Sequence, residues 1–235
     1  MVWADTSKGP ERSGRPRSAV TRRLAAVAAV LLLTQAAWAA PLEVYGRLPH
    51  LEDFALSPDG ARIAFVKTEG NTRIVDVYSV VAHTMLRGMR VGDEKLRYIR
   101  WADNDRLMIV TSVTTVPFGF IGENGEWEQL EVFDVRTGKR FGVPQNDQFN
   151  GVELLNAIAG RPMVRHIKDH TVLFVPGVQV TNETALALIG FDLDTQNSHV
   201  VRVGKPGTLG WVVDETGDVQ AEETYSDATI RVAEG

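Results

Sequence analysis

The sequence predicts an all-β fold of short antiparallel strands, and three observations lead to this prediction. After Pro41 the apolar residues alternate with polar ones instead of following the 3.6-residue spacing of a helix. A strand–turn–strand pattern, first present at Leu51–Val66, returns further along the chain. A second pattern, an aromatic residue followed two positions later by Val or Leu, also recurs. Short strands repeating at roughly 40–50 residues predict an incomplete β-propeller, with about three and a half four-stranded blades after an N-terminal signal peptide.

Residues 1–39 have the composition of a secretory signal peptide. Arg22 and Arg23 precede the apolar run Leu24–Leu33, and the segment A-W-A that ends at Ala39 offers small residues to a signal peptidase. The run is shorter than the ~20 residues that cross a bilayer, so an uncleaved membrane anchor is the less favoured alternative. We expect cleavage near Ala39, a secreted or periplasmic protein and no stable membrane span. The long stretch before Arg22 is consistent with a gene start placed too far upstream.

Composition and charge exclude several classes of function. The 235 residues include no cysteine, so a disulfide, a thiolate metal site and a cysteine nucleophile are all impossible. After residue 39 the chain keeps 19 Lys or Arg residues against 28 Asp or Glu residues, a net charge of −9. An acidic secreted domain is a poor nucleic-acid binder, so we expect no nucleic-acid partner. Nothing in the sequence calls for a cofactor.

The first element is a hairpin at Leu51–Val66, with the sequence LEDFALSPDGARIAFV. Its turn, Ser57–Gly60, combines a proline that sets φ, an aspartate that can bond its own backbone and a glycine that accepts positive φ. Similar strand–turn–strand segments follow at Tyr98–Val110 and Gly210–Ala221. A degenerate copy lies near Leu154–His166, and we expect Gly160, Arg161 and Pro162 to form its turn.

The second repeated element is the strand that carries an aromatic residue. It occurs at Val77–Val80, Val132–Val135 and Gly190–Leu193, and each copy runs into a turn. A β-sandwich also has short alternating strands, but it does not require the same strand–turn–strand pattern to return in register, which favours the propeller. We therefore assign residues 1–39 to the signal peptide and 40–235 to a partial propeller, with blades at about 51–92, 95–145, 150–204 and, incompletely, 207–235.

The hairpin sequence resembles a known repeat. Leu56–Phe65 (LSPDGARIAF) is similar to the repeat of periplasmic propellers and to that of the N-terminal domain of the prolyl oligopeptidase family of serine peptidases. The start of the mature chain at Pro41–Ala55 resembles secreted bacterial members of that family, as do Ile99–Leu107 and Trp211–Val219. The resemblance covers about residues 41 to 230 and implies a propeller that admits short peptides to an α/β-hydrolase domain.

The resemblance also implies what this chain lacks. The hydrolase domain of the family carries a catalytic Ser, Asp and His in that order, with the serine in a G-x-S-x-G turn. No serine of the 235 residues has that neighbourhood. We interpret Ser57 as a turn residue and Ser79 and Ser112 as strand residues. We therefore expect no catalytic residue here, a chain inactive by itself, and the missing hydrolase domain and peptides as partners. The alternative is a stand-alone periplasmic propeller that binds a protein or another ligand.

Two further pairs of residues have the side-chain chemistry of a site. His166 and His170 would share a metal only on a helix, and Met163–Val175 is better interpreted as strand, turn and strand, so we expect no metal site. Glu222 and Glu223 are candidate substrate contacts, because dipeptidyl peptidases of the family hold a substrate amino terminus with a glutamate pair. That pair sits in a helical insertion, which we do not find here. Solvent-exposed strand glutamates are therefore the favoured interpretation.

Overall fold

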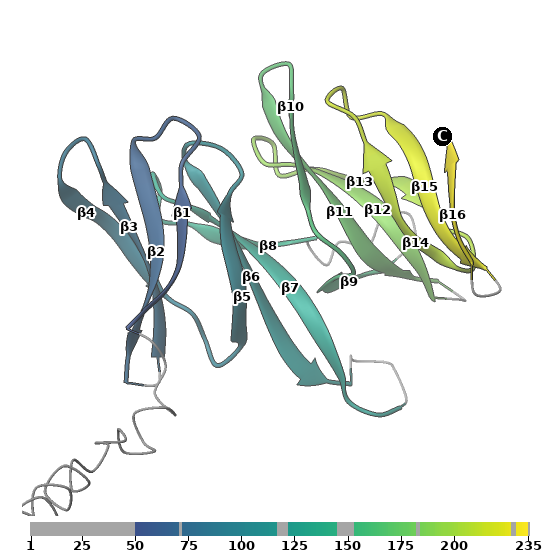
Figure 1. The fold of residues 1–235 in the computed structure, drawn as a ribbon, viewed down its shortest axis with the longest axis horizontal. Coiled ribbons are helices and arrows are strands. Elements are labelled where there is room, and N and C mark those ends of the chain that lie inside the picture. The colour runs from purple at the N-terminus through teal and green to yellow at the C-terminus, as the bar shows by residue number, and fades with distance from the viewer. Residues whose placement is uncertain are drawn as a thin grey trace, which may run out of the picture. The chain divides into compact units, whose positions relative to one another are not determined.

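The computed structural model divides into two compact units, Met1–Arg47 and Leu48–Gly235, and every described residue lies in the second. The described ranges are 50–70, 72–116, 122–144, 153–181, 184–226 and 229–234. The predicted signal peptide lies outside them. Within these ranges the chain forms sixteen β-strands and no helix, and none of the described segments is a helix long and apolar enough to cross a membrane (Figure 1).

The first sheet is a four-stranded antiparallel meander in chain order. It comprises β1 (Leu51–Leu56), β2 (Arg62–Glu69), β3 (Thr72–Ser79) and β4 (Thr84–Arg90). The predicted hairpin is therefore confirmed as β1 and β2, joined by the Ser57–Gly60 turn. A propeller blade has this four-stranded form.

Local hydrogen bonds explain why this turn forms. The Ser57 hydroxyl donates to Asp59 Oδ1 at 2.6 Å and accepts from the Arg62 amide at 2.9 Å. The Ala61 amide also donates to Asp59 Oδ1, at 3.0 Å. Gly60 adopts φ 71°, a left-handed conformation that glycine accepts without steric cost. Residues 57–62 thus close this corner with bonds among themselves.

The middle sheet has nine strands and joins the second and third repeats. The second repeat forms β5 (Lys95–Trp101), β6 (Arg106–Thr115), β7 (Gly125–Asp134) and β8 (Arg140–Val143). The third forms β9 (Glu153–Ile158), β10 (Met163–Ile167), β11 (His170–Val180), β12 (Thr184–Asp192) and β13 (Ser198–Val203). One residue pair, Glu128 with Ile158, bridges β7 and β9 and makes the two groups one sheet.

The predicted turn at residues 160–162 is wrong. β9 and β10 both pair with the same side of β11, so residues 159–162 interrupt one strand position rather than joining two strands that pair with each other. The hairpin turn lies instead at Lys168 and Asp169, where Lys168 has φ 55°. Pro162 explains the interruption, because proline has no N–H to donate to a ladder. The strand–turn–strand interpretation of Met163–Val175 is confirmed as β10 and β11.

The last described sheet has three antiparallel strands, β14 (Thr208–Val213), β15 (Val219–Ser226) and β16 (Thr229–Glu234). β14 and β15 are the predicted strands of Gly210–Ala221. The aromatic strands are confirmed as well, since Tyr78, Phe133 and Phe191 lie in β3, β7 and β12. These three are the strands that follow the hairpin of each repeat.

Three hydrophobic clusters hold successive repeats together. The first packs Val66 and Val75 of the first sheet against Ile109 and Phe133 of the middle sheet. The second fills the interior between the second and third repeats, and the third packs Phe174 and other β11–β12 residues against the β14 residues Trp211 and Val213. The predicted fold class is confirmed: an all-β, propeller-type array whose described sheets do not close into a ring.

Candidate functional site

A cleft lies between the first strands of two successive repeats. Its volume is about 620 Å³, and it is lined by residues of β1, β5 and the 159–162 interruption. Two bonds hold β1 beside β5: Trp101 Nε1 donates to the Ala55 carbonyl at 2.9 Å, and the Ile99 amide donates to Asp53 Oδ2 at 2.9 Å. The volume falls within the range of about 300–1,000 Å³ that is usual for small-ligand clefts.

The cleft has one apolar wall and one basic wall. Phe54 and Leu56 of β1 line it and are 53% and 60% exposed. Arg100 and Arg161 line it as well, and both are exposed. Strand alternation explains the basic wall, because Arg100 lies between the buried residues Ile99 and Trp101 and so points to the opposite face.

Tyr98 lies among the charges of this cleft. Burial and the negative charge of Glu128 raise the pKa of the Tyr98 phenol, against the opposing positive charges of Arg161 and Arg100. The phenol therefore remains protonated and able to donate a hydrogen bond at neutral pH. Within the described part of the chain, the side chains of Arg100 and Arg161 make no hydrogen bond or ion pair. Both guanidinium groups are thus available to a ligand.

Other arginines cross from one repeat to the next. Arg62 of β2 donates to the Asn104 carbonyl at 2.7 Å and lies 3.2 Å from Asp105. Arg165 of β10 donates to the carbonyls of Val213 and Asp214, the latter at 2.7 Å. These bonds link the start of one repeat's strands to the hairpin turn of the next, so they reinforce the order of the sheets.

Arg106 makes a similar link between the second and third repeats. Its Nε lies 2.5 Å from Asp103 Oδ2, and its Nη1 lies 2.9 Å from Asp194 Oδ1. The Arg106 side chain is only 14% exposed. Burial lowers the pKa of this guanidinium, but the bonds to Asp194 and Asp103 outweigh it and the net shift is upward.

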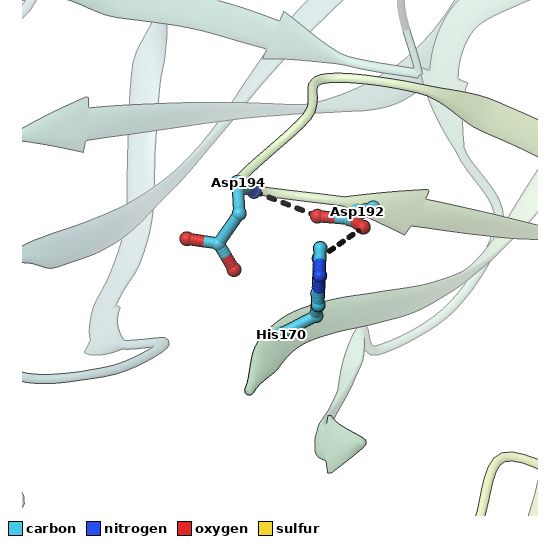
Figure 2. Close-up of side chains that lie close together, drawn as sticks. All are labelled: His170, Asp192 and Asp194. Carbon is cyan, nitrogen blue, oxygen red and sulfur yellow. Dashed lines mark hydrogen bonds and ion pairs between the residues drawn. The ribbon is translucent and has the colours of Figure 1, made fainter. Parts of the chain in front are cut away.

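Asp194 also belongs to a cluster with His170 and Asp192, which Figure 2 shows. One ligand atom from each of the three lies within 4.8 Å of the others, a spacing that a metal ion could use. His170 Nδ1 lies 2.7 Å from Asp192 Oδ2, while the Asp194 amide donates to Asp192 Oδ1 at 2.8 Å. The Thr171 amide donates to Asp194 Oδ2 at 2.9 Å.

Every carboxylate oxygen of this cluster therefore has a donor, and the guanidinium of Arg106 adds positive charge at its edge. An ion pair and backbone amides already supply what a cation would supply. We interpret the cluster as a structural cross-link of the β12–β13 turn. His166 lies on β10 and bonds the Thr171 hydroxyl, so the two histidines predicted to lie apart do not share this cluster.

Glu222 and Glu223 lie next to each other on β15. Glu222 accepts a 2.6 Å hydrogen bond from the Thr208 hydroxyl of β14 and is partly buried, whereas Glu223 is exposed. Successive side chains of a strand point to opposite faces, so these carboxylates do not converge on one ammonium group. Their role as substrate contacts stays a prediction.

The serines have structural partners. Ser57 belongs to the hairpin turn, Ser79 accepts a bond from the Ala82 amide at 3.0 Å, and Ser112 accepts from Arg97 at 2.7 Å. All three are buried. None has a histidine among its hydrogen-bond partners in the described part of the chain.

Sequence reasoning missed the cleft. The sequence predicts a turn at Arg161 and a strand at Arg100. The one local feature that points to the basic wall is the alternation of basic and apolar residues in β5. The approach of residues 98–100 to residue 161 depends on how the repeats pack, and the local sequence does not specify that packing.

No protein-family model matches the sequence, and no curated protein sequence does either. Among solved structures, the chain is similar to an acylaminoacyl peptidase in complex with Z-Gly-Gly-Phe-chloromethyl ketone, at 15% identity over 80% of this chain, with a TM-score of 0.44. It is also similar to TolB from Acinetobacter baumannii (8% identity, 78% of this chain, TM-score 0.39). A third similar structure is the tricorn protease (12% identity, 78% of this chain, TM-score 0.38).

The chain spans 31% of the length of that acylaminoacyl peptidase, 41% of TolB and 23% of the tricorn protease.

Proposed function

We propose that this chain is the non-catalytic propeller portion of a serine peptidase of the prolyl oligopeptidase family, one that admits short peptides to an α/β-hydrolase domain. The observation that carries the proposal is the cleft between β1 and β5, whose 620 Å³ would accept a short peptide. Its walls are first strands of successive repeats, and one of them leads into the L-S-P-D-G segment on which the family resemblance rests.

The division of labour follows from the residues. The 235 residues contain no G-x-S-x-G serine, so nucleophile and oxyanion donors must come from another domain. The propeller contributes a rigid frame and a cleft that selects by size and charge. In this proposal the protein is exported, its signal peptide is removed near Ala39, and its partners are the hydrolase domain and peptides.

A second candidate function is a stand-alone periplasmic propeller that binds a protein or another ligand. Arg100 and Arg161 favour it, because their guanidinium groups make no hydrogen bond or ion pair with the described residues and binding through them needs no catalytic domain.

The coding DNA that follows the codon of Gly235 distinguishes the two candidates. Translated in all frames, it should encode a G-x-S-x-G serine followed by an Asp and a His if the chain is the propeller of a peptidase. Further closing blades with no such serine would contradict the peptidase proposal and support the stand-alone binder.

A further inference from the structure

We propose that Arg100 and Arg161 bind the C-terminal carboxylate of a short peptide, whose last side chain is apolar and lies against Phe54 and Leu56. This inference deepens the proposed function and rests on its peptide-binding role. It assigns a ligand class and a binding direction to the cleft.

The charges of the cleft support an anionic ligand. Three arginines line it, and Arg97 is already engaged by Ser112 and Glu126. Arg100 and Arg161 make no bond of this kind with the described residues, although both act on the same phenol, that of Tyr98. Both arginines line the same cleft, and a guanidinium group matches the geometry of a carboxylate.

Two carboxylates, those of Asp53 and Glu128, oppose the positive charges of Arg100 and Arg161. Asp53 lines the cleft, but its Oδ2 accepts from the Ile99 amide at 2.9 Å and its Oδ1 from the Phe54 amide at 2.8 Å, so its carboxylate is held by the backbone. Glu128 of β7, which is separated from β5 by β6, adds a negative charge that acts on the Tyr98 phenol. Two guanidinium groups and the carboxylate of Glu128 act on the Tyr98 phenol, and backbone amides hold the carboxylate of Asp53, in a chain that is acidic as a whole.

The apolar wall of the cleft favours a ligand that has an apolar group next to its carboxylate. Phe54 and Leu56 stand on the same face of β1, two positions apart, and both expose more than half of their side-chain surface. A ligand that places an apolar group there removes this surface from water. A peptide with a free carboxylate and an apolar last residue supplies both features in adjacent atoms.

The test is isothermal titration calorimetry of the full purified chain with three probes: N-acetyl-Ala-Ala-Leu with a free carboxylate, the same peptide as its C-terminal amide, and inorganic phosphate. We expect the free acid to bind at least about tenfold more tightly than the amide, the factor that one charge-assisted hydrogen bond can supply. We also expect N-acetyl-Ala-Ala-Gly with a free carboxylate to bind more weakly than the leucine peptide, because it leaves Phe54 and Leu56 exposed.

Variants locate the site. Arg100→Gln and Arg161→Gln should each weaken binding of the free acid by about tenfold and bring it close to that of the amide. Both residues are exposed, so the substitutions should leave the circular-dichroism spectrum unchanged. The matched control is Arg202→Gln, an exposed strand arginine outside the cleft, which should bind as the parent chain does.

Three results would overturn the inference. Equal affinities for the acid and the amide would show that the carboxylate is not recognised. That result would still be compatible with a propeller that binds peptides. If phosphate binds as tightly as the free-acid peptide, the cleft is a site for simple anions and not for peptides. If the folded chain binds none of the probes, the cleft has no such ligand. The proposed function would not be contradicted by that result, because the DNA sequence after Gly235 tests it independently.

Discussion

Replacing Arg106 with alanine should destabilise the protein by about 2–3 kcal/mol, because one side chain links the second repeat to the third. Its bond to Asp103 lies between groups that are 14% and 17% exposed, so we take about 1.5 kcal/mol, the lower end for a hydrogen bond to a charged group. Its bond to Asp194 reaches a carboxylate that is 39% exposed, so solvent screening reduces it to about 1 kcal/mol. For a chain of this size the loss corresponds to a fall in Tm of about 5–10 °C.

The assay is urea unfolding followed by circular dichroism and by tryptophan fluorescence. The matched control is Arg140→Ala, which removes an ion pair with Glu131 that is 3.7 Å long and whose partners are 53% and 39% exposed. That control should change the free energy of unfolding by less than about 1 kcal/mol. If Arg106→Ala is no less stable than Arg140→Ala, Arg106 does not hold the repeats together in the way described.

Further predictions follow from the same contacts and from the missing nucleophile. Burial raises the pKa values of Asp192 and Asp194, but hydrogen bonds and nearby positive charges together lower them by more. Backbone amides lower both pKa values, His170 lowers that of Asp192 further and Arg106 that of Asp194, so both pKa values lie below 3.8. Their contribution to stability is full above that pH and is lost as the pH falls through the lowered values, so acid unfolding should begin below about pH 4 and shift upward in Asp194→Asn. The chain alone should not hydrolyse chromogenic peptides, and activity abolished by an organophosphate would contradict this. Because the described sheets end in unclosed edges, the isolated chain should oligomerise in sedimentation experiments, and a monodisperse monomer with a cooperative melt would disagree.

Local chemistry made part of this fold predictable from the sequence. The turn at Ser57–Gly60 closes through hydrogen bonds among residues at most five positions apart, so its sequence alone identifies the hairpin. The aromatic strands were predictable from a recurring local pattern, because Phe133 and Phe191 are each followed two positions later by an apolar residue, Val135 or Leu193, and all four are buried.

The third repeat was harder to predict because its pairing is not local. Gly160, Arg161 and Pro162 have the composition of a turn, but β11 is long enough to pair with both β9 and β10, and the proline only interrupts that edge. The same interruption places Arg161 in the cleft beside β5. The sequence around residue 161 predicts neither the pairing of β9 and β10 with β11 nor the place of Arg161 in the cleft. Both depend on which strands lie next to this segment.

The site was the least predictable part. Adjacent acidic residues suggested Glu222 and Glu223, yet strand alternation separates their carboxylates. The residues that do come together, Tyr98, Arg100 and Arg161, are up to 63 positions apart and belong to no sequence motif. Their grouping results from packing between repeats, which periodicity alone does not specify.

Hydrogen–deuterium exchange of the full chain, with and without N-acetyl-Ala-Ala-Leu, tests most directly whether the cleft is a peptide site. β1 and β5 are edge strands of their sheets, so part of their backbone amides has no ladder partner and exchanges readily. The peptide should slow exchange in residues 53–56 and 97–101 and leave β15 unchanged. Protection confined to β15, around Glu222 and Glu223, or no protection in either strand of the cleft, would contradict the account.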